Sequence, residues 1–194
     1  AGGSTLFRST NEGSSFEPIS PPLARNDPRT LGPSGGPITR DQTGVETYGV
    51  VFARAESFQS PDVLWVGTDD GYVQLTRDGG RTWKNVTPPG IGDFTRISIV
   101  EAGHFAAGTA YVAANRFQLD DFRPLLYRTT DYGATWTLIT TGIPADEFTR
   151  VIREDPVRRG LLYAGTERGV YLSYDDGAHW QKLQRNLPPV PVHD

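Results

Sequence analysis

The 194-residue chain contains 22 Gly and 15 Pro but no Cys and no Met, and its 19 basic and 23 acidic residues leave a formal net charge of −4. This composition excludes a disulfide framework and a thiolate metal site, and it argues against a helical bundle and a nucleic-acid-binding protein, which would carry a basic stripe. No apolar run approaches the roughly 18 residues of a membrane span, so we expect none. Because Met is absent even at residue 1, we expect the chain to be a piece of a longer product.

The pattern Ser/Thr-x-Asp-x-Gly-x-x-Trp occurs three times, at residues 76–83, 129–136 and 173–180, and a degenerate copy with Asn and Phe occupies residues 9–16. Successive Asp or Asn positions are separated by 67, 53 and 44 residues. Periods of about 40–50 residues are typical of β-propeller blades. The residues that define these repeats are Asn11, Asp78, Asp131, Asp175, Trp83, Trp136 and Trp180.

Each copy of the pattern lies between two segments with the composition of β-strands, such as residues 71–75 and 136–139. The pattern therefore predicts a hairpin turn. In this turn the Gly supplies a positive φ, the Asp accepts hydrogen bonds from N–H groups, and the Trp covers the turn with an apolar face. We interpret these Asp residues as structural rather than catalytic, because one isolated Asp recurs in the same turn of every repeat.

Taken in chain order, the repeats predict an all-β protein of about three and a half propeller blades, in which each full blade is a four-stranded antiparallel sheet. A hairpin over residues 6–19 forms the half-blade. The strands expected in the full blades are residues 48–56, 63–67, 71–76 and 83–86, then 96–100, 109–113, 125–129 and 136–139, and finally 150–153, 161–165, 170–173 and 180–183. The expected segments are a half-blade at 1–19, a connection at 20–46, blades at 47–87, 88–140 and 141–185, and the start of a further blade at 186–194.

The connection over residues 20–46 is rich in Pro and Gly and has no apolar period. It is either a surface connection or a loop that covers a binding face. Because known propellers use four or more blades, three and a half blades cannot close a ring and would expose sheet edges. We therefore expect an arc of a larger propeller, with closure through another copy or another chain as the alternative. The remaining propeller blades, from the same or another chain, are expected partners in both cases.

The repeated turns resemble the Asp-box repeats of bacterial neuraminidases. The closest resemblance is to the sortilin-like propeller of large bacterial proteins labelled glycosyl hydrolases, and it covers essentially the whole chain. The residues that carry it are 32–39, 65–71, 119–124 and 186–194. This resemblance implies a β-propeller, a periplasmic or extracellular location and a protein or glycan ligand.

Candidate functional residues follow from the geometry of a blade, whose strands we call A to D. The repeated turns join strands C and D on one face, whereas the loops between strands B and C emerge on the opposite face, the B–C face. This face is expected to carry an acidic rim that includes Asp69, Asp70, Asp120 and Asp121. The longest B–C insertion, residues 115–124, interleaves Arg with aromatic residues. The candidate binding residues are Arg116, Phe117, Phe122, Arg123, Glu167 and Arg168.

The sequence leaves three functions open. The first is an extracytoplasmic recognition or scaffold module that binds a protein or glycan on the B–C face. The second is a glycoside hydrolase, which needs two carboxylates roughly 5–9.5 Å apart, here drawn from Asp69, Asp70, Asp120 and Asp121. The third is a subunit or assembly factor of a large periplasmic complex. Whether the protein is an enzyme stays open, although the sequence favours no activity for this chain alone.

Motifs for bound cofactors do not occur in the sequence. His104, His179 and His193 are widely separated and have no metal-ligand spacing. No Gly-rich phosphate loop and no Gly-x-Ser-x-Gly nucleophile elbow are present. We therefore expect neither a metal nor a cofactor.

Overall fold

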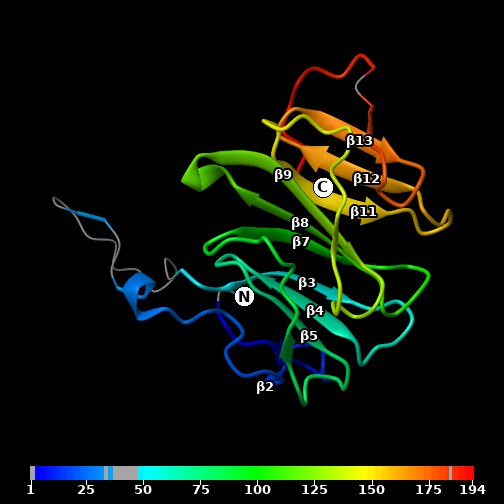
Figure 1. Ribbon diagram of the computed structural model, residues 1–194. Helices are drawn as coiled ribbons and strands as arrows, with labels where there is room; N and C mark the ends of the chain where they lie inside the picture. Colours follow the sequence, from blue (N-terminus) through cyan, green and yellow to red (C-terminus); the bar gives the residue numbers. More distant parts are fainter. Residues whose placement is uncertain (1–2, 33–34, 37–47, 184) are drawn as a thin grey trace.

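The computed structural model describes residues 3–32, 35–36, 48–183 and 185–194. Residues 33–34 and 37–46 of the expected connection, and residues 1–2, 47 and 184 of other expected segments, lie outside the described residues. The described residues form four antiparallel sheets that follow one another in chain order from the lower to the upper part of Figure 1. Three of these sheets have four strands and the first has two, which confirms the predicted fold class of three and a half blades.

The sheets are numbered 1 to 4 in chain order. Sheet 1 consists of β1 (Phe7–Arg8) and β2 (Glu17–Pro18). Sheet 2 consists of β3 (Val51–Glu56), β4 (Leu64–Thr68), β5 (Val73–Thr76) and β6 (Lys84–Asn85). Sheet 3 consists of β7 (Arg96–Ala102), β8 (Ala110–Arg116), β9 (Asp121–Thr129) and β10 (Thr137–Leu138). Sheet 4 consists of β11 (Thr149–Glu154), β12 (Leu162–Thr166), β13 (Gly169–Ser173) and β14 (Gln181–Lys182).

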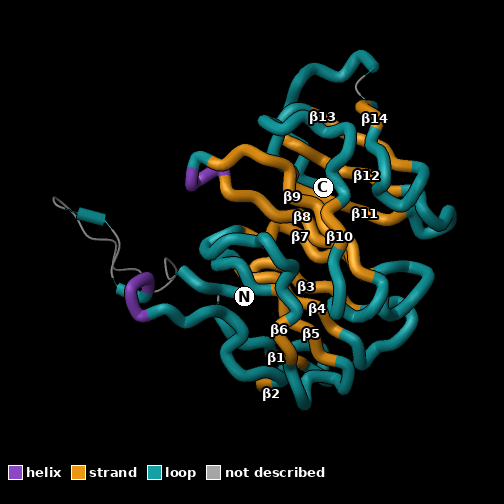
Figure 2. The backbone as a smooth tube through the Cα atoms, in the orientation of Figure 1, coloured by secondary structure: helices purple, strands orange, loops and turns teal. Residues whose placement is uncertain are grey.

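The described helical structure comprises two short 3₁₀ turns, η1 (Pro28–Thr30) and η2 (Phe117–Leu119). The turn η2 lies at the tip of the β8–β9 hairpin (Figure 2). The sequence predicted a B–C insertion over residues 115–124, between strands expected at 109–113 and 125–129, but the strands extend further into it. The ladder between β8 and β9 continues to the pair Arg116 and Asp121, so the insertion lengthens the hairpin and η2 forms its tip.

In each full sheet the strands are ordered as in the sequence, from an inner strand to an outer one. The inner strands β3, β7 and β11 contact one another in series. Each of them contains a register shift of one residue, between Val51 and Ala53, between Ile97 and Ile99, or between Thr149 and Val151. A shift of this kind is a β-bulge, which re-aims a side chain at the strand end. All three bulges lie at the end of the strand that reaches the B–C face.

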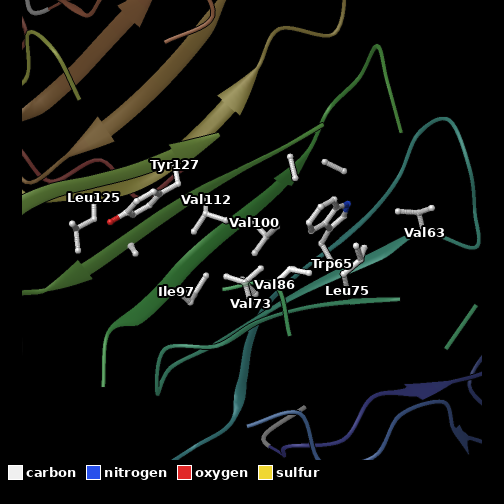
Figure 3. Packing of buried hydrophobic residues seen from close by; sticks show 14 residues of the cluster. Val63, Trp65, Val73, Leu75, Val86, Ile97, Val100, Val112, Leu125 and Tyr127 are labelled. Carbon is white, nitrogen blue, oxygen red and sulfur yellow. The ribbon is translucent and has the colours of Figure 1, made fainter. Parts of the chain in front are cut away.

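The hydrophobic core fills the spaces between successive sheets. On β8, Val112 belongs to the cluster shared with sheet 2, and its neighbour Tyr111 belongs to the cluster shared with sheet 4. Figure 3 shows the first cluster, in which Trp65, Ile97 and Val112 are fully buried. Because successive residues of a strand point to opposite faces, a sheet that is buried on both faces needs apolar residues at consecutive positions. Each fully buried aliphatic side chain contributes about 1.5–3 kcal/mol to folding.

The repeated turn is held by a small set of local hydrogen bonds. In sheet 3, the Thr129 hydroxyl donates to Asp131 Oδ1 at 2.8 Å and accepts from the Gly133 N–H at 2.9 Å. Asp131 Oδ1 also accepts from the Thr135 N–H at 2.8 Å. The corresponding bonds recur in the turns of sheets 2 and 4. In the degenerate turn Asn11 Oδ1 still accepts from the backbone N–H four residues later, at 2.9 Å.

The Gly and Trp of each complete turn also contact the preceding sheet, which the sequence did not predict. The indole N–H of Trp136 donates to the Val86 carbonyl at 2.7 Å. Gly133 has a φ of +74°, and a Cβ at this position would lie 2.7 Å from Val86 Cβ. The indole N–H of Trp180 likewise donates to the Ile139 carbonyl at 2.7 Å, so the contact repeats from sheet to sheet.

We expect Gly133→Ala to lower the free energy of unfolding by about 2 kcal/mol or more. The new methyl group would combine a left-handed backbone with overpacking against Val86, and each effect costs about 1–2 kcal/mol. Urea unfolding followed by far-UV circular dichroism measures the change. Gly32→Ala is the matched control, because no atom of the described residues, apart from its chain neighbours, lies within 4 Å of the Gly32 Cβ position. Equal stability of the two variants would contradict the inter-sheet contact.

The turn carboxylates predict a second effect, on the pH dependence of stability. Hydrogen bonds from Thr135 hold the pKa of Asp131 at about 2, whereas an unfolded Asp titrates near 3.9. The stabilisation is therefore complete above about pH 4 and is lost as the pH falls towards 2. Asp131→Asn should flatten this dependence between pH 4 and 2 in urea unfolding curves, because Asn does not titrate. The reciprocal variant Asn11→Asp should steepen it, and an unchanged slope in both variants would contradict the assignment.

Candidate functional site

The B–C face forms as the sequence predicted. On the opposite face, the A–B turn of sheet 2 touches the repeated turn, where the Gly79 N–H donates to the Asp62 carbonyl at 2.9 Å. On the B–C face, the B–C loop of sheet 2 contacts the connection into sheet 3, where the Phe94 N–H donates to the Asp70 carbonyl at 3.3 Å. In sheet 4 the B–C loop contacts the connection into its own sheet, where the Glu167 N–H donates to the Phe148 carbonyl at 3.2 Å, as the Asp69 N–H donates to the Val50 carbonyl at 3.1 Å in sheet 2. The B–C loops and the connections between sheets thus form one continuous surface.

Asp69 and Asp70, two of the candidate catalytic acids, bind backbone groups. Asp69 Oδ1 accepts from the Gly49 and Val50 N–H groups at 3.2 and 2.7 Å, and burial raises the pKa of its carboxyl. Asp70 is only 3% exposed. Its two oxygens accept from the Thr68 hydroxyl at 2.6 Å and from the Arg25 N–H at 2.9 Å. The two carboxylates therefore hold residues 25 and 49–50, which precede β3, against the B–C loop of sheet 2.

Asp120 and Asp121, the other candidate acids, lie at the tip of the β8–β9 hairpin. Asp120 is exposed and has a left-handed φ of 56°, where it ends η2. Asp121 binds the Arg123 guanidinium in a bidentate manner, at 2.9 and 2.7 Å, and it lies 3.4 Å from Arg116. The hydrogen bonds from Arg123 lower the pKa of Asp121 below its usual range. The Asp121 carboxylate is thus neutralised by two arginines.

The expected acidic rim is instead a network of ion pairs. Arg25, which the sequence did not single out, binds Asp93 at 2.7 Å, and Arg116 donates to the Asp93 carbonyl at 2.8 Å. Of the predicted binding residues, Arg168 lies 3.2 Å from an Asp146 oxygen and Glu167 accepts from an arginine of β11. Because most carboxylates on this face have an arginine or backbone partner, the surface presents little free acid.

A buried acid, Glu147, is paired with two hydroxyl groups instead. Glu147 is 2% exposed and accepts from the Thr166 hydroxyl at 2.5 Å and from the Tyr171 hydroxyl at 3.0 Å. Burial, followed by the hydrogen bond to Glu147, raises the pKa of Tyr171. A buried polar group needs hydrogen-bond partners, so the bonds of the Glu147 carboxyl group fix the connection into sheet 4 against β12 and β13.

Arginine and phenylalanine side chains alternate across the B–C face and form its most distinctive feature. The Arg96 guanidinium lies 5.1 Å from the Phe52 ring and 6.0 Å from the Phe117 ring. The Arg150 guanidinium lies 5.5 Å from Phe117 and 4.9 Å from Phe148. We call this row the Arg–Phe ladder, which consists of Phe52, Arg96, Phe117, Arg150, Phe148 and Phe122.

The ladder joins three sheets. Phe117, at the tip of the β8–β9 hairpin, stacks on Phe148 with ring centroids 4.9 Å apart, and Phe122 lies 6.2 Å from the same ring. Phe52 and Arg150 are the residues at the bulges of β3 and β11, which explains why both point along this face. The structure thus brings the predicted residues Phe117 and Phe122 together.

Four members of the ladder were not predicted from the sequence: Phe52, Arg96, Phe148 and Arg150. A signal for three of them exists, because residues 93–96 and 147–150 repeat the motif acid-Phe-Thr-Arg before an inner strand. Phe52 has no comparable sequence signal, since the bulge that exposes it appears only in the pairing register.

Neither a metal site nor a membrane helix is found among the described residues. Within residues 3–32, 35–36, 48–183 and 185–194, no group of three or more His, Asp and Glu side chains could hold a metal ion. The helices of this part of the chain are too short and too polar to cross a membrane.

Comparison with known proteins identifies the fold and no family. No family model and no curated protein matches the chain. Among solved structures, YCF48 from Cyanidioschyzon merolae is 22% identical with a TM-score of 0.52, over 69% of this chain and 36% of its own. An ancestral GH74 enzyme is 18% identical with a TM-score of 0.66, over 93% and 21% of the two chains. YCF48 bound to D1 peptide is 23% identical with a TM-score of 0.55, over 72% and 42%.

The chain therefore spans less than half of the length of each of these structures. At identities below 25% the similarity shows the fold alone. The described residues form a partial β-propeller, as the arrangement of the sheets already indicates.

The contacts of Asp70 and Asp120 predict that removal of each carboxylate changes the free energy of unfolding by a different amount. Asp70→Ala should lower the free energy of unfolding by about 2 kcal/mol or more, because it leaves the Thr68 hydroxyl and the Arg25 N–H without their acceptor. Asp120→Asn should change it by less than about 0.5 kcal/mol, because no hydrogen bond to the exposed Asp120 carboxylate is found among the described residues and Asn tolerates the left-handed backbone of this position. Urea unfolding of the two variants measures the difference. An Asp70→Ala variant as stable as Asp120→Asn would show that the Asp70 carboxylate is not structural.

Proposed function

We propose that this chain is an extracytoplasmic recognition or scaffold module, which binds a protein or glycan partner through the B–C face. We further propose that its repeated turns are Asp-box repeats and that it is related to the sortilin-like propellers of large bacterial proteins. The observation that carries the binding function is the Arg–Phe ladder.

The ladder has the composition of a binding surface. Its end members Phe52 and Phe122 are 51% and 46% exposed, which is unusual for Phe on a folded protein. Arginine and aromatic residues are enriched among the residues that dominate binding energy at protein interfaces. Aromatic faces also offer apolar surface to a sugar ring. Phe52 and Phe122 thus add exposed apolar surface to a face on which most carboxylates are paired.

The arginines of the ladder differ in how they are neutralised. Arg150 binds Glu167, with its Nε 2.7 Å from a carboxylate oxygen. Arg96 donates to the side-chain carbonyl of Gln118 at 3.1 Å, and its buried Nε has no hydrogen-bond partner. No carboxylate among the described residues pairs with Arg96. A partner that supplies an acceptor next to Phe52 and Phe117 would satisfy this arginine.

The structural neighbours are compatible with this proposal. One of them is YCF48 bound to D1 peptide, which is a propeller that binds a peptide. A role as subunit or assembly factor of a periplasmic complex is a special case of the same function, because it also requires a protein-binding face.

A glycoside hydrolase is the alternative, and one observation favours it. The pKa of Asp69 is raised by burial and that of Asp121 is lowered by Arg123. Two carboxyl groups with opposite shifts are the arrangement expected for a general acid and a base or nucleophile. The hydrogen bonds of Asp69 to backbone N–H groups favour the structural role instead.

Binding measurements on Phe122→Ser test the proposal. The probes are an array of plant and bacterial glycans and an array of peptides. We expect one class of probe to bind the wild-type protein, and we expect Phe122→Ser to weaken that binding by about tenfold or more, because a buried aromatic anchor contributes about 2 kcal/mol. Phe58→Ser is the matched control, since Phe58 is 62% exposed on the opposite face and should leave binding unchanged.

Two outcomes would contradict the proposal. Equal loss of binding in both Phe variants would place the ligand elsewhere on the chain. Release of reducing sugar from a bound glycan, abolished by Asp69→Asn and by Asp121→Asn in folded protein, would establish the hydrolase instead.

A further inference from the structure

A large cavity lies between sheet 1 and sheet 2, away from the Arg–Phe ladder except at Phe52. It has a volume of about 740 Å³ and is lined by β1, by the whole of β3 and by Leu64 to Val66 of β4. Protein interiors rarely contain voids much larger than a water molecule, so a space of this size between two packed sheets is a vacant groove. We call it the sheet 1 groove. It shares Phe52 with the ladder, but its other lining residues lie outside the residues that carry the proposed function.

The groove lies where the other sheets have two further strands. In sheets 2, 3 and 4, strands A and B lie next to the C–D hairpin, on the side of strand C. Sheet 1 has only β1 and β2, which are joined by the degenerate turn and so correspond to that C–D hairpin. Within the described part of the chain, β1 pairs with β2 on one side and with no strand on the side that faces the groove. An edge of this kind can accept another strand.

Three phenylalanines leave a large apolar area in the groove. Phe7 on β1, Phe16 in the degenerate turn and Phe52 on β3 line it and are 57%, 64% and 51% exposed. Phe16 occupies the position of the Trp that closes each complete turn, and one such Trp, Trp180, is only 4% exposed. The apolar content therefore favours a polypeptide that packs against these rings over a small polar ligand.

Comparison of β3 with β11 shows which residues of sheet 2 differ from their equivalents in sheet 4. The pairing register aligns Arg54 of β3 with Ile152 of β11, because each follows the residue that pairs with the Gly of the second strand. Ile152 is fully buried against sheet 3, whereas Arg54 is exposed in the groove. The face that sheet 2 turns towards sheet 1 thus carries a charged residue where the equivalent face of sheet 4 is apolar.

The same alignment places Glu56 at the position of Glu154, since both end an inner strand and pair with a Leu. Glu154 accepts from the Tyr111 hydroxyl at 3.1 Å and from the His104 N–H at 2.6 Å. Both donors belong to the A–B hairpin of the preceding sheet. Glu56 is exposed, and no hydrogen bond or ion pair to its carboxylate is found among the described residues. The Glu56 carboxylate is therefore an acceptor in the groove. Its equivalent Glu154 shows which donors such a carboxylate binds, namely a tyrosine hydroxyl and a backbone N–H.

We propose that the sheet 1 groove receives a two-stranded antiparallel β-hairpin from outside residues 1–194, which pairs with β1 and completes sheet 1 as a four-stranded blade. Its second strand carries a hydroxyl donor opposite Glu56, as Tyr111 does opposite Glu154. Its inner strand carries an acidic residue near Arg54 and apolar residues against Phe7 and Phe52.

A peptide that copies the chain's own A–B hairpin tests this proposal. The probe is residues 96–116, closed end to end to hold the hairpin, because Arg96 pairs with Asn115 near its ends and an isolated hairpin is marginally stable. It contains His104 and Tyr111, the two donors that Glu154 uses. Titration into ¹⁵N-labelled protein should give saturable shifts confined to β1, β2, β3 and β4.

A double-mutant cycle makes the test specific. The Tyr111→Phe form of the peptide and the Glu56→Gln form of the protein should each bind about tenfold more weakly, as expected for loss of a charge-assisted hydrogen bond. Combining the two changes should cost little more than either one, because they remove the same bond. Glu56 is exposed, so its replacement should leave the fold intact, and Glu12→Gln, outside the groove lining, is the matched control.

Three results would overturn the proposal. The first is the absence of saturable binding at millimolar peptide. The second is binding whose shifts lie outside the groove, or that is unchanged by both substitutions. The third is concentration-dependent self-association of the wild-type chain that protects the same residues, which would assign the groove to a second copy.

Discussion

The position of each full sheet depends on one contact, in which the Gly and Trp of a turn meet the residue that directly follows the preceding outer strand. Trp136 and Gly133 both contact Val86, and the turn that carries them is fixed internally by Thr129 and Asp131. A local hydrogen-bonded turn therefore sets the spacing between two sheets. The apolar clusters between the sheets and the row of inner strands form only at this spacing, and the inner strands in turn align the loops of the B–C face.

This spacing also decides what the acidic residues do. Where sheets pack closely, carboxylates are partly removed from water and must find hydrogen-bond donors or cations. Asp70 finds the Thr68 hydroxyl and the Arg25 backbone, and Asp121 finds two arginines. The B–C face is consequently neutralised, and its remaining chemistry is the alternation of arginine and aromatic rings in the Arg–Phe ladder.

Agreement and difference between the repeats have separate consequences. Where the repeats agree, as in the turns and the apolar inner strands, the residues hold the sheets together. Where the repeats differ, residues are exposed that can form an interaction surface. The longer β8–β9 hairpin brings Phe117 to the ladder. Arg54 is exposed at the position that corresponds to the buried Ile152 of sheet 4. The two proposed interaction surfaces, the ladder and the sheet 1 groove, both arise at such differences.

The sequence by itself determined the number of sheets, the strands within them and the turn chemistry at Asp78, Asp131 and Asp175, because these features depend on spacing and side-chain type within a few residues. Only the tertiary structure decided which carboxylates are neutralised and which rings meet. Asp70 contacts Arg25, 45 positions away, and a one-residue bulge turns Phe52 towards Arg96. Contacts between different sheets depend on register and inter-sheet distance, and a linear pattern contains neither of these quantities.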